Sequence, residues 1–188
     1  MEAARRAMRA NAPRPATPPP AGRPQASNAM GTFANHPVLA HAYFTFNGHI
    51  LYTSSIDARQ RELVILRVAA LRHSEYEWAQ HVHLGRQAGL VDTEIERVIE
   101  GPAAAGWSPF EAALLAATDQ LIADARIGDE TWSALADVYD ERQLMDLVFT
   151  VGAYETLAMA FCTFGVQMDA DLLHTTPRLP DKPARNDR

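Results

Sequence analysis

The sequence predicts an all-α protein, and three features lead to this fold class. Apolar residues recur at three- and four-residue spacing along most of residues 35–166. Several of these apolar segments begin at a serine or aspartate and end at a glycine, the residues that favour helix starts and stops. No stretch shows the alternation of apolar and polar residues that is typical of a half-buried strand. We therefore expect about seven helices.

The composition indicates a single globular domain that does not bind nucleic acid. Of the 188 residues, 47% are hydrophobic and 21% are charged, and the formal net charge is −6. A nucleic-acid surface needs clustered cations, which this charge balance disfavours. The single cysteine, Cys162, cannot form an internal disulfide. This fits a reducing compartment, and we expect a cytoplasmic protein.

Two polar segments flank the predicted helical domain, which we place at residues 29–173. Residues 1–28 are rich in proline and arginine and lack the apolar run of a secretory signal. We interpret them as a disordered or arm-like extension that is able to lie on another subunit. Residues 174–188 are polar and proline-rich, and we expect them to form a mobile tail.

The first predicted helix covers residues 35–52. His36 followed by Pro37 is a helix-start signal, because proline fits the first helical turn. Apolar positions 39, 43, 46 and 50 then form one stripe. We expect Tyr43, Phe44 and Phe46 to lie in the core or in the wall of a pocket, because aromatic residues at helical spacing are usually buried.

The second predicted helix, residues 57–71, is the element that we expect at the centre of the fold. Asp57 fits a helix-capping carboxylate, with Gln60 as its reciprocal partner. Residues 63–71 are apolar except for Arg67, so the helix must be covered on most of its sides. Glu62 lies in its first turns, where a closed environment would raise the pKa of its carboxyl group.

The third predicted helix begins at Ser74 and ends at Gly89. Ser74 and Glu77 fit the two positions of a capping box. Glu77 and His81 are four residues apart on the same stripe, so their side chains can touch. A carboxylate beside an imidazole raises its pKa and holds one tautomer, which suits acid–base catalysis near neutral pH. The plainer alternative is a helix cap followed by a solvated pair.

Three shorter helical segments or turns follow before the last helix. Residues 92–101 are expected to form a short helix, with Thr93 and Glu96 as a possible capping box. A stronger start signal stands at Ser108, which is followed by a proline and then by Glu111. That helix is expected to run to residue 124, and the next to begin at Gly128.

The last predicted helix, residues 141–166, contains twenty mostly apolar residues and is long enough to cross a membrane. Tyr154 and Glu155 near its centre disfavour a membrane span, so we interpret it as a core helix that another subunit partly covers. We expect Glu155 to form a buried ion pair with Arg67 or to line a pocket. Cys162 is expected to be an inert thiol in the core.

The segments RELVILRVAAL and EYEWAQHVHLGRQAG, at residues 61–71 and 75–89, resemble the carboxymuconolactone decarboxylase family, which includes the AhpD-like alkylhydroperoxidases. The resemblance covers about residues 35–170. In the redox branch of this family, a glutamate precedes a CxxCxxxH motif. Those positions hold Glu62, Ser74, Glu77 and His81 here. Thiol–disulfide exchange needs two sulfur atoms, so a CxxC peroxidase mechanism is excluded, and the chain resembles the thiol-free branch.

The resemblance implies an AhpD-like, oligomeric helical domain and an enzyme without a redox cofactor. It implies a homo-oligomer built on dimers or trimers that acts on a small molecule. From the polar residues of the last helix we also expect no membrane binding. The expected reaction is acid–base chemistry, a decarboxylation, another C–C cleavage or an isomerisation, on a small organic acid or lactone, for example from aromatic-compound degradation. The residues expected to take part are His81, Glu62 and Glu77 as catalytic groups, and Tyr76, Trp78, Arg67 (or Arg72) and Phe46 as substrate-binding groups.

Other chemistries fit the sequence less well. A metal site would need more than Glu77 and His81, and His83 points to the other side of the helix, so we expect no metal. Ser74 lies two helical turns from His81, beyond the reach of a nucleophile–base hydrogen bond. Two alternatives stay open: a non-catalytic helical oligomer that binds a ligand or partner, and an alkylhydroperoxidase-type antioxidant that receives its sulfur from Cys162 or a partner.

Overall fold

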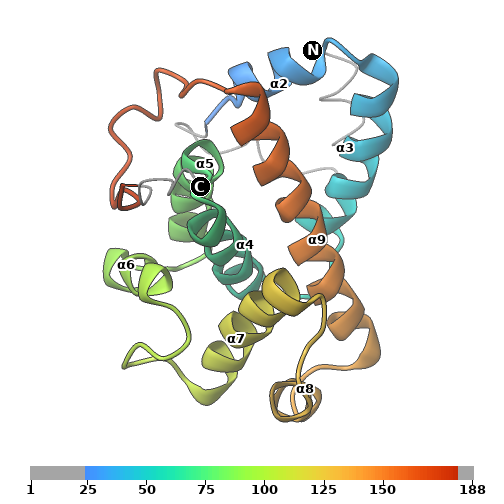
Figure 1. Ribbon diagram of the computed structural model, residues 1–188, viewed down its shortest axis with the longest axis vertical. Coiled ribbons are helices and arrows are strands. Elements are labelled where there is room, and N and C mark those ends of the chain that lie inside the picture. The colour runs from blue at the N-terminus through green and yellow to red at the C-terminus, as the bar shows by residue number, and fades with distance from the viewer. Residues whose placement is uncertain (1–23, 182–188) are drawn as a thin grey trace, which may run out of the picture.

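The computed structural model describes residues 24–181, and within this range the protein is helical and contains no strand. The all-α fold class is therefore confirmed. The described residues form eight helices (Figure 1): α2 (Ser27–Phe33), α3 (Pro37–Tyr52), α4 (Ala58–Arg72), α5 (Glu75–Gln87), α6 (Asp92–Glu100), α7 (Pro109–Asp124), α8 (Asp129–Ala136) and α9 (Glu141–Phe164). Seven were expected; the additional one, α2, begins inside the segment that we interpreted as an extension, most of which lies outside the described residues.

Helix α4 is the centre of the fold, as its sequence predicts. It packs against α5, α6, α7 and α9, and every residue from 62 to 70 is buried. Figure 1 shows α9 crossing the molecule beside α4, with α3 on one side and α6 on the opposite side. The composition of α4 explains this position. A helix that is apolar nearly all round is destabilised wherever one of its sides remains in water, so other helices cover it.

Two hydrophobic clusters lie on different sides of α4. The larger contains Val64, Ile65 and Val68 together with apolar residues of α7 and α9. The smaller contains Leu63 and Leu66 together with apolar residues of α5 and α6. Burial of each such side chain stabilises the fold by about 1.5–3 kcal/mol relative to exposure. Because α4 supplies residues to both clusters, its rotation and position are strongly fixed.

Most of the predicted helix starts are confirmed. The side chain of His36 accepts a hydrogen bond from the backbone N–H of Leu39, and that of Asp57 accepts one from Arg59. Ser108 and Glu111 form the predicted reciprocal capping box of α7.

The predicted reciprocal side-chain contacts at the starts of α4 and α6 are wrong. The side chain of Gln60 does not return to Asp57, but accepts a hydrogen bond from the hydroxyl of Tyr139. Helix α6 is not capped by Thr93 and Glu96; the carboxylate of Glu94 accepts from the backbone N–H of Val91 instead. The partner of Gln60 is 79 residues away in the sequence, whereas Glu94 caps its own helix two residues before the predicted Glu96.

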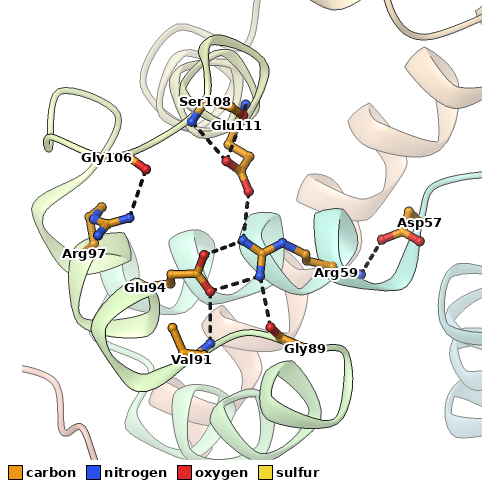
Figure 2. A network of polar contacts seen from close by, with 9 residues as sticks. All are labelled: Asp57, Arg59, Gly89, Val91, Glu94, Arg97, Gly106, Ser108 and Glu111. Carbon is orange, nitrogen blue, oxygen red and sulfur yellow. Dashed lines mark hydrogen bonds and ion pairs between the residues drawn. The ribbon is translucent and has the colours of Figure 1, made fainter.

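Arg59 joins the starts of three helices (Figure 2). Its guanidinium donates to both carboxylate oxygens of Glu94, at 2.6 and 3.0 Å, to Glu111 at 2.9 Å and to the carbonyl of Gly89 at 3.2 Å. Glu94 and Glu111 each also cap the start of their own helix. We call Arg59, Glu94 and Glu111 the Arg59 network. It fixes α4, α6 and α7 relative to one another through fully partnered charges.

The buried Arg67 has a structural partner other than the one predicted. It forms a two-bond ion pair with Asp119, at 2.6 and 2.8 Å, and donates to the carbonyls of Val98 and Ile99 at the end of α6. Gly101 follows with φ +97°, and a Cβ atom there would lie only 2.6 Å from the Arg67 guanidinium. The predicted pair of Arg67 with Glu155 is therefore wrong, because helix packing turns Arg67 toward α6 and α7.

Helix α9 has one buried and one exposed side. Its inner side packs on α4, whereas Met145, Phe149, Met159 and Phe164 are exposed. Among the described helices, α9 is the one that passes a length and composition test for a membrane span, a test that core helices of soluble proteins also pass. Cys162 is exposed as well, so its predicted place in the core is wrong.

The segment after α9 folds back over the domain. Asp169 accepts a hydrogen bond from the Tyr76 hydroxyl, and Leu172 lies in the larger hydrophobic cluster. The carbonyl of Pro177 accepts one from the indole of Trp78, and Leu179 packs against the smaller cluster. The predicted tail thus makes specific contacts as far as the structure describes it, and its remaining residues lie outside the described range.

Candidate functional site

The centre of the candidate site is a hydrogen bond between Glu62 and His81. Nδ1 of His81, on α5, lies 2.7 Å from one carboxylate oxygen of Glu62, in the first turns of α4. Both residues are buried, at 1% and 6% exposure. The other oxygen of Glu62 accepts from the guanidinium of Arg61 at 3.3 and 3.4 Å. The carboxylate thus has a cation on one side and an imidazole on the other.

Tyr154 of α9 closes one side of this pair. Its ring packs edge-on against the imidazole of His81, with ring centroids 4.8 Å apart. Burial raises the pKa of the Tyr154 phenol well above its ordinary value, and the nearby Glu62 carboxylate raises it further. The phenol therefore keeps its proton at neutral pH. An aromatic wall of this kind also limits the access of water to His81.

Glu77 lies on α5 one turn before His81, but its environment is different. It is 1% exposed, and neither of its carboxyl oxygens has a hydrogen-bond partner. Burial raises the pKa of Glu77 well above its ordinary value, and the charge of Glu155 adds to this. Glu77 therefore holds its proton in the range where an exposed glutamate has lost it. The predicted contact between Glu77 and His81 is not among the hydrogen bonds of the site.

Ser74 begins α5 as predicted, but its side chain does not cap the helix. Its backbone carbonyl accepts the first helical hydrogen bond, from Trp78. Its hydroxyl is buried and without a partner, like the oxygens of Glu77 three residues later. The predicted capping box is therefore wrong. Two buried polar side chains on one stripe of α5 are left unsatisfied, which is uncommon in folded proteins.

Helix α3 contributes a second tyrosine and an amide. The hydroxyl of Tyr43 donates to the carbonyl of Ala153 at 2.5 Å, and the pKa of Tyr43 is raised by burial and by the charge of Glu77. Asn47, one turn further along α3, is buried and its Oδ1 atom has no partner. The predicted site residue Phe46 packs its ring against Tyr43, so it lies next to the site.

The other predicted substrate-binding residues are engaged elsewhere. Tyr76 donates to Asp169 and packs on Phe161, and the indole of Trp78 donates to Pro177. The contacts of Arg67 go to α6 and α7, as described above. Arg72 forms an ion pair with Glu155 at 2.6 Å. We therefore retain Glu62, Glu77, His81 and Phe46, and we set aside Tyr76, Trp78 and Arg67 as substrate-binding groups.

Sequence reasoning did not identify Arg61 or Tyr154 as parts of the site, nor the buried Asn47 on α3. A polar residue inside an otherwise apolar helical stretch was the available signal for Asn47 and Tyr154. For Arg61 there was no such signal, because an arginine beside a glutamate is common on helix surfaces. The packing of α4, α5 and α9 brings Arg61 to Glu62 and Tyr154 to His81.

The arrangement can move a proton. An ionised Glu62 can only accept a hydrogen bond, so Nδ1 of His81 is the donor, and the other ring nitrogen, Nε2, is left to take up or give a proton. Glu62 also stabilises the imidazolium that forms when Nε2 accepts a proton. No group of three histidine, cysteine, aspartate or glutamate side chains that could hold a metal occurs between residues 24 and 181.

Comparison with a known protein family agrees with the resemblance noted in the sequence. The sequence model of the carboxymuconolactone decarboxylase family matches residues 37–120, the segment that contains Glu62, Glu77 and His81. The resemblance to this family is thereby confirmed. Among curated proteins, none matches this chain.

Solved structures show the same fold. A putative antioxidant defence protein AhpD from Agrobacterium tumefaciens has a TM-score of 0.68 and 18% identity, covering 73% of this chain and 95% of its own. A peroxidase-related protein with an alkylhydroperoxidase AhpD core from Ralstonia eutropha has a TM-score of 0.70 and 15% identity, with 77% and 78% covered. A variant of the debrominase Bmp8 in complex with 2,3,4-tribromopyrrole has a TM-score of 0.67 and 16% identity, with 80% and 84% covered.

Proposed function

We propose that this chain, whose residues 37–120 match the carboxymuconolactone decarboxylase family, is an enzyme that performs acid–base chemistry without a redox cofactor. Its substrate is a small organic acid or lactone, and its reaction is a decarboxylation, another C–C cleavage or an isomerisation. The observation that carries the proposal is the buried 2.7 Å hydrogen bond between His81 and Glu62. A buried, oriented imidazole is the most common general acid–base group of enzymes.

His81 takes the proton-transfer role in each of these reactions. In an isomerisation, Nε2 removes a proton from the carbon next to a carbonyl, and the electrons of the C–H bond form an enolate. The same nitrogen then returns the proton to another carbon. In a decarboxylation, the electrons of the breaking C–C bond form the enolate as CO2 leaves, and the imidazolium of His81 supplies the proton. Glu62 holds the ring and balances its charge in both cases.

The composition of the site speaks against a peroxidase. The positions of the two thiols are taken by Ser74 and Glu77, and the only cysteine of the chain, Cys162, is exposed on α9. A dithiol–disulfide cycle lacks its second sulfur. The burial of Glu62 and His81 also favours an enzyme over a non-catalytic relative, in which a solvated pair would be expected.

The remaining expectations about the protein belong to this proposal. We propose a homo-oligomer based on dimers or trimers, in which other subunits cover the exposed apolar side of α9 that contains Met145, Phe149 and Met159. We also propose a cytoplasmic location and a substrate of small size. The complex of the Bmp8 variant with 2,3,4-tribromopyrrole supports the last point, since a small ring occurs there in the same fold.

The test is a substrate screen with a matched pair of variants. Lactones, hydroxy acids and keto acids related to aromatic degradation are offered to the wild type, and turnover is followed by ultraviolet absorbance. His81→Gln should lower kcat about 100-fold or more, because the general acid–base group is removed. His83→Gln, two residues away and on the other side of α5, should leave kcat within about twofold. Equal turnover by wild type and a folded His81→Gln protein would refute the proposal.

A further inference from the structure

The start of α5 contains buried polar atoms that no other side chain satisfies. Ser74 Oγ and both carboxyl oxygens of Glu77 lack a hydrogen-bond partner, although each residue is only 1% exposed. Native proteins rarely leave buried polar atoms unpaired, and those that they leave are usually satisfied by a water molecule or a ligand. The two side chains are three residues apart, so they lie on one side of the helix.

The hydrogen-bonding character of these atoms restricts the ligand. Glu77 is surrounded by groups that oppose its ionisation: burial acts first, and the charge of Glu155 acts second. A neutral carboxyl group has one O–H donor, and the serine hydroxyl has another. Two adjacent donors suit a carbonyl oxygen, which has two lone pairs.

The charges around the site argue against an anionic group at this position. Glu62 is paired with Arg61 and His81, and Glu155 is paired with Arg72. Each of these arginines is therefore occupied by a carboxylate of the chain. The other titratable side chains that act on Glu77 or Glu62 are the phenols of Tyr43 and Tyr154, which stay neutral. A carboxylate of a ligand would meet the acidic side chains Glu62 and Glu155, and both nearby arginines already have an acidic partner; the one unpartnered basic atom beside Ser74 is Nδ1 of His73.

We infer that Ser74 and Glu77 bind the carbonyl oxygen of an uncharged ligand, a lactone, an ester or a ketone, rather than a carboxylate. This inference rests on the proposed function and narrows it to an isomerisation or a C–C cleavage other than decarboxylation, because an uncharged ligand has no carboxylate to lose as CO2. His81 lies one helical turn beyond Glu77, on the same stripe of α5. A carbonyl held by Ser74 and Glu77 therefore turns its neighbouring carbon toward the imidazole, and the O–H groups stabilise the enolate oxygen that forms when His81 removes a proton.

The test compares lactones with the hydroxy acids that form when their rings open. The two pairs are 2(5H)-furanone with 4-hydroxybut-2-enoate, and phthalide with 2-(hydroxymethyl)benzoate. Binding to the full-length protein at neutral pH is measured by ligand-observed NMR titration. We expect each lactone to bind about tenfold or more tightly than its hydroxy acid, because only the latter brings a charge. Tighter or equal binding of the hydroxy acids, or binding of neither lactone, would overturn the inference.

Variants of Ser74 and Glu77 test whether the lactone binds to these two side chains. Glu77→Leu, similar in size but without donors, should weaken lactone binding about tenfold or more, and Ser74→Ala should weaken it severalfold. Glu77→Gln keeps an N–H donor and should stay within about threefold of the wild type. Glu75→Gln, at an exposed position of the same helix, is the matched control. Unchanged lactone binding in both Glu77→Leu and Ser74→Ala would also overturn the inference.

Measuring lactone binding and turnover in the same variant tests this inference and the proposed function separately. In His81→Gln, lactone binding should remain within about threefold, whereas turnover is lost. If hydroxy acids bind best while His81→Gln is inactive, the inference fails and the acid–base function stands. If lactones bind through Glu77 while His81→Gln is fully active, the proposed acid–base function of His81 is refuted and the proposed carbonyl-binding site is supported. Circular dichroism of each variant confirms that the loss of binding is not a loss of fold.

Discussion

Two regions of the molecule use glutamate in opposite ways. In the Arg59 network, Glu94 and Glu111 share one guanidinium and cap the starts of α6 and α7 (Figure 2). The hydrogen bond from Arg59 lowers the pKa of Glu94. At the start of α5, Glu77 is fully buried without a partner, and burial raises its pKa. In the Arg59 network both carboxylates have hydrogen-bond partners, whereas the carboxyl oxygens of Glu77 have none.

This difference distinguishes a structural role from a functional one. A partnered carboxylate contributes to stability, whereas a buried carboxyl group without a partner costs stability and needs another reason to be present. Binding of a ligand is such a reason, because a site keeps polar groups available that the folded chain alone does not satisfy. The comparison predicts opposite stability effects when the two regions are changed.

The largest stability effect is expected in the Arg59 network. Arg59→Met should lower the free energy of unfolding by about 1–3 kcal/mol, because it leaves two adjacent carboxylates without their cation. Chemical denaturation with urea, followed by circular dichroism, measures this change. Arg86→Met, which removes an exposed ion pair with Asp92, is the control and should change the free energy of unfolding much less than Arg59→Met does. An equal loss in both variants would show that the network is no more than surface charge.

The next effect should have the opposite sign. Glu77→Leu is expected to raise the free energy of unfolding by about 1–2 kcal/mol, because it removes unsatisfied oxygens from a buried position and adds apolar volume. The same urea titration measures it, with Glu75→Leu on the exposed side of α5 as the control. A strong destabilisation by Glu77→Leu would contradict the view that Glu77 serves ligand binding at the expense of stability.

The two regions should also differ in the pH dependence of their stability. The pKa of Glu94 is lower in the folded protein than its ordinary value of 4.5, so its stabilising contribution is present above that value and is lost as the pH falls through the folded pKa. The pKa of Glu77 is raised well above 4.5. Stability linked to Glu77 is therefore complete below its unfolded pKa and decreases as the pH rises toward the folded pKa.

Two variants resolve these contributions. The free energy of unfolding is measured from pH 4 to pH 8 for the wild type, Glu94→Gln and Glu77→Gln. Relative to the wild type, Glu77→Gln should flatten the decline at higher pH, by up to about 1.4 kcal/mol per pH unit. Glu94→Gln should lower the free energy of unfolding above about pH 4.5, and the difference from the wild type should shrink as the pH falls through the folded pKa of Glu94. Curves of the same shape for wild type and Glu77→Gln would show that Glu77 does not retain its proton in the folded protein.

Signals within one or two helical turns were sufficient for most of the fold. The apolar run of α4 predicted a central helix, and Asp57 and Ser108 predicted where two helices begin. These predictions depend only on neighbours up to four residues away, which the sequence displays directly. The positions of Glu62 and His81 followed from the resemblance to a known family, and the structure brings the two residues into contact.

The tertiary structure determined which side chains far apart in the sequence form hydrogen bonds and ion pairs. Arg67 pairs with Asp119 rather than Glu155, Trp78 turns to Pro177, and Ser74 and Glu77 are left without partners. Each outcome depends on how the helices are rotated and spaced against one another. The sequence alone determined that the segments from α3 to α9 are helices and that α4 is buried, because local periodicity sets both; it did not reveal α2. The packing of α3, α5 and α9 around α4 determined which polar groups meet, since that depends on all contacts at once.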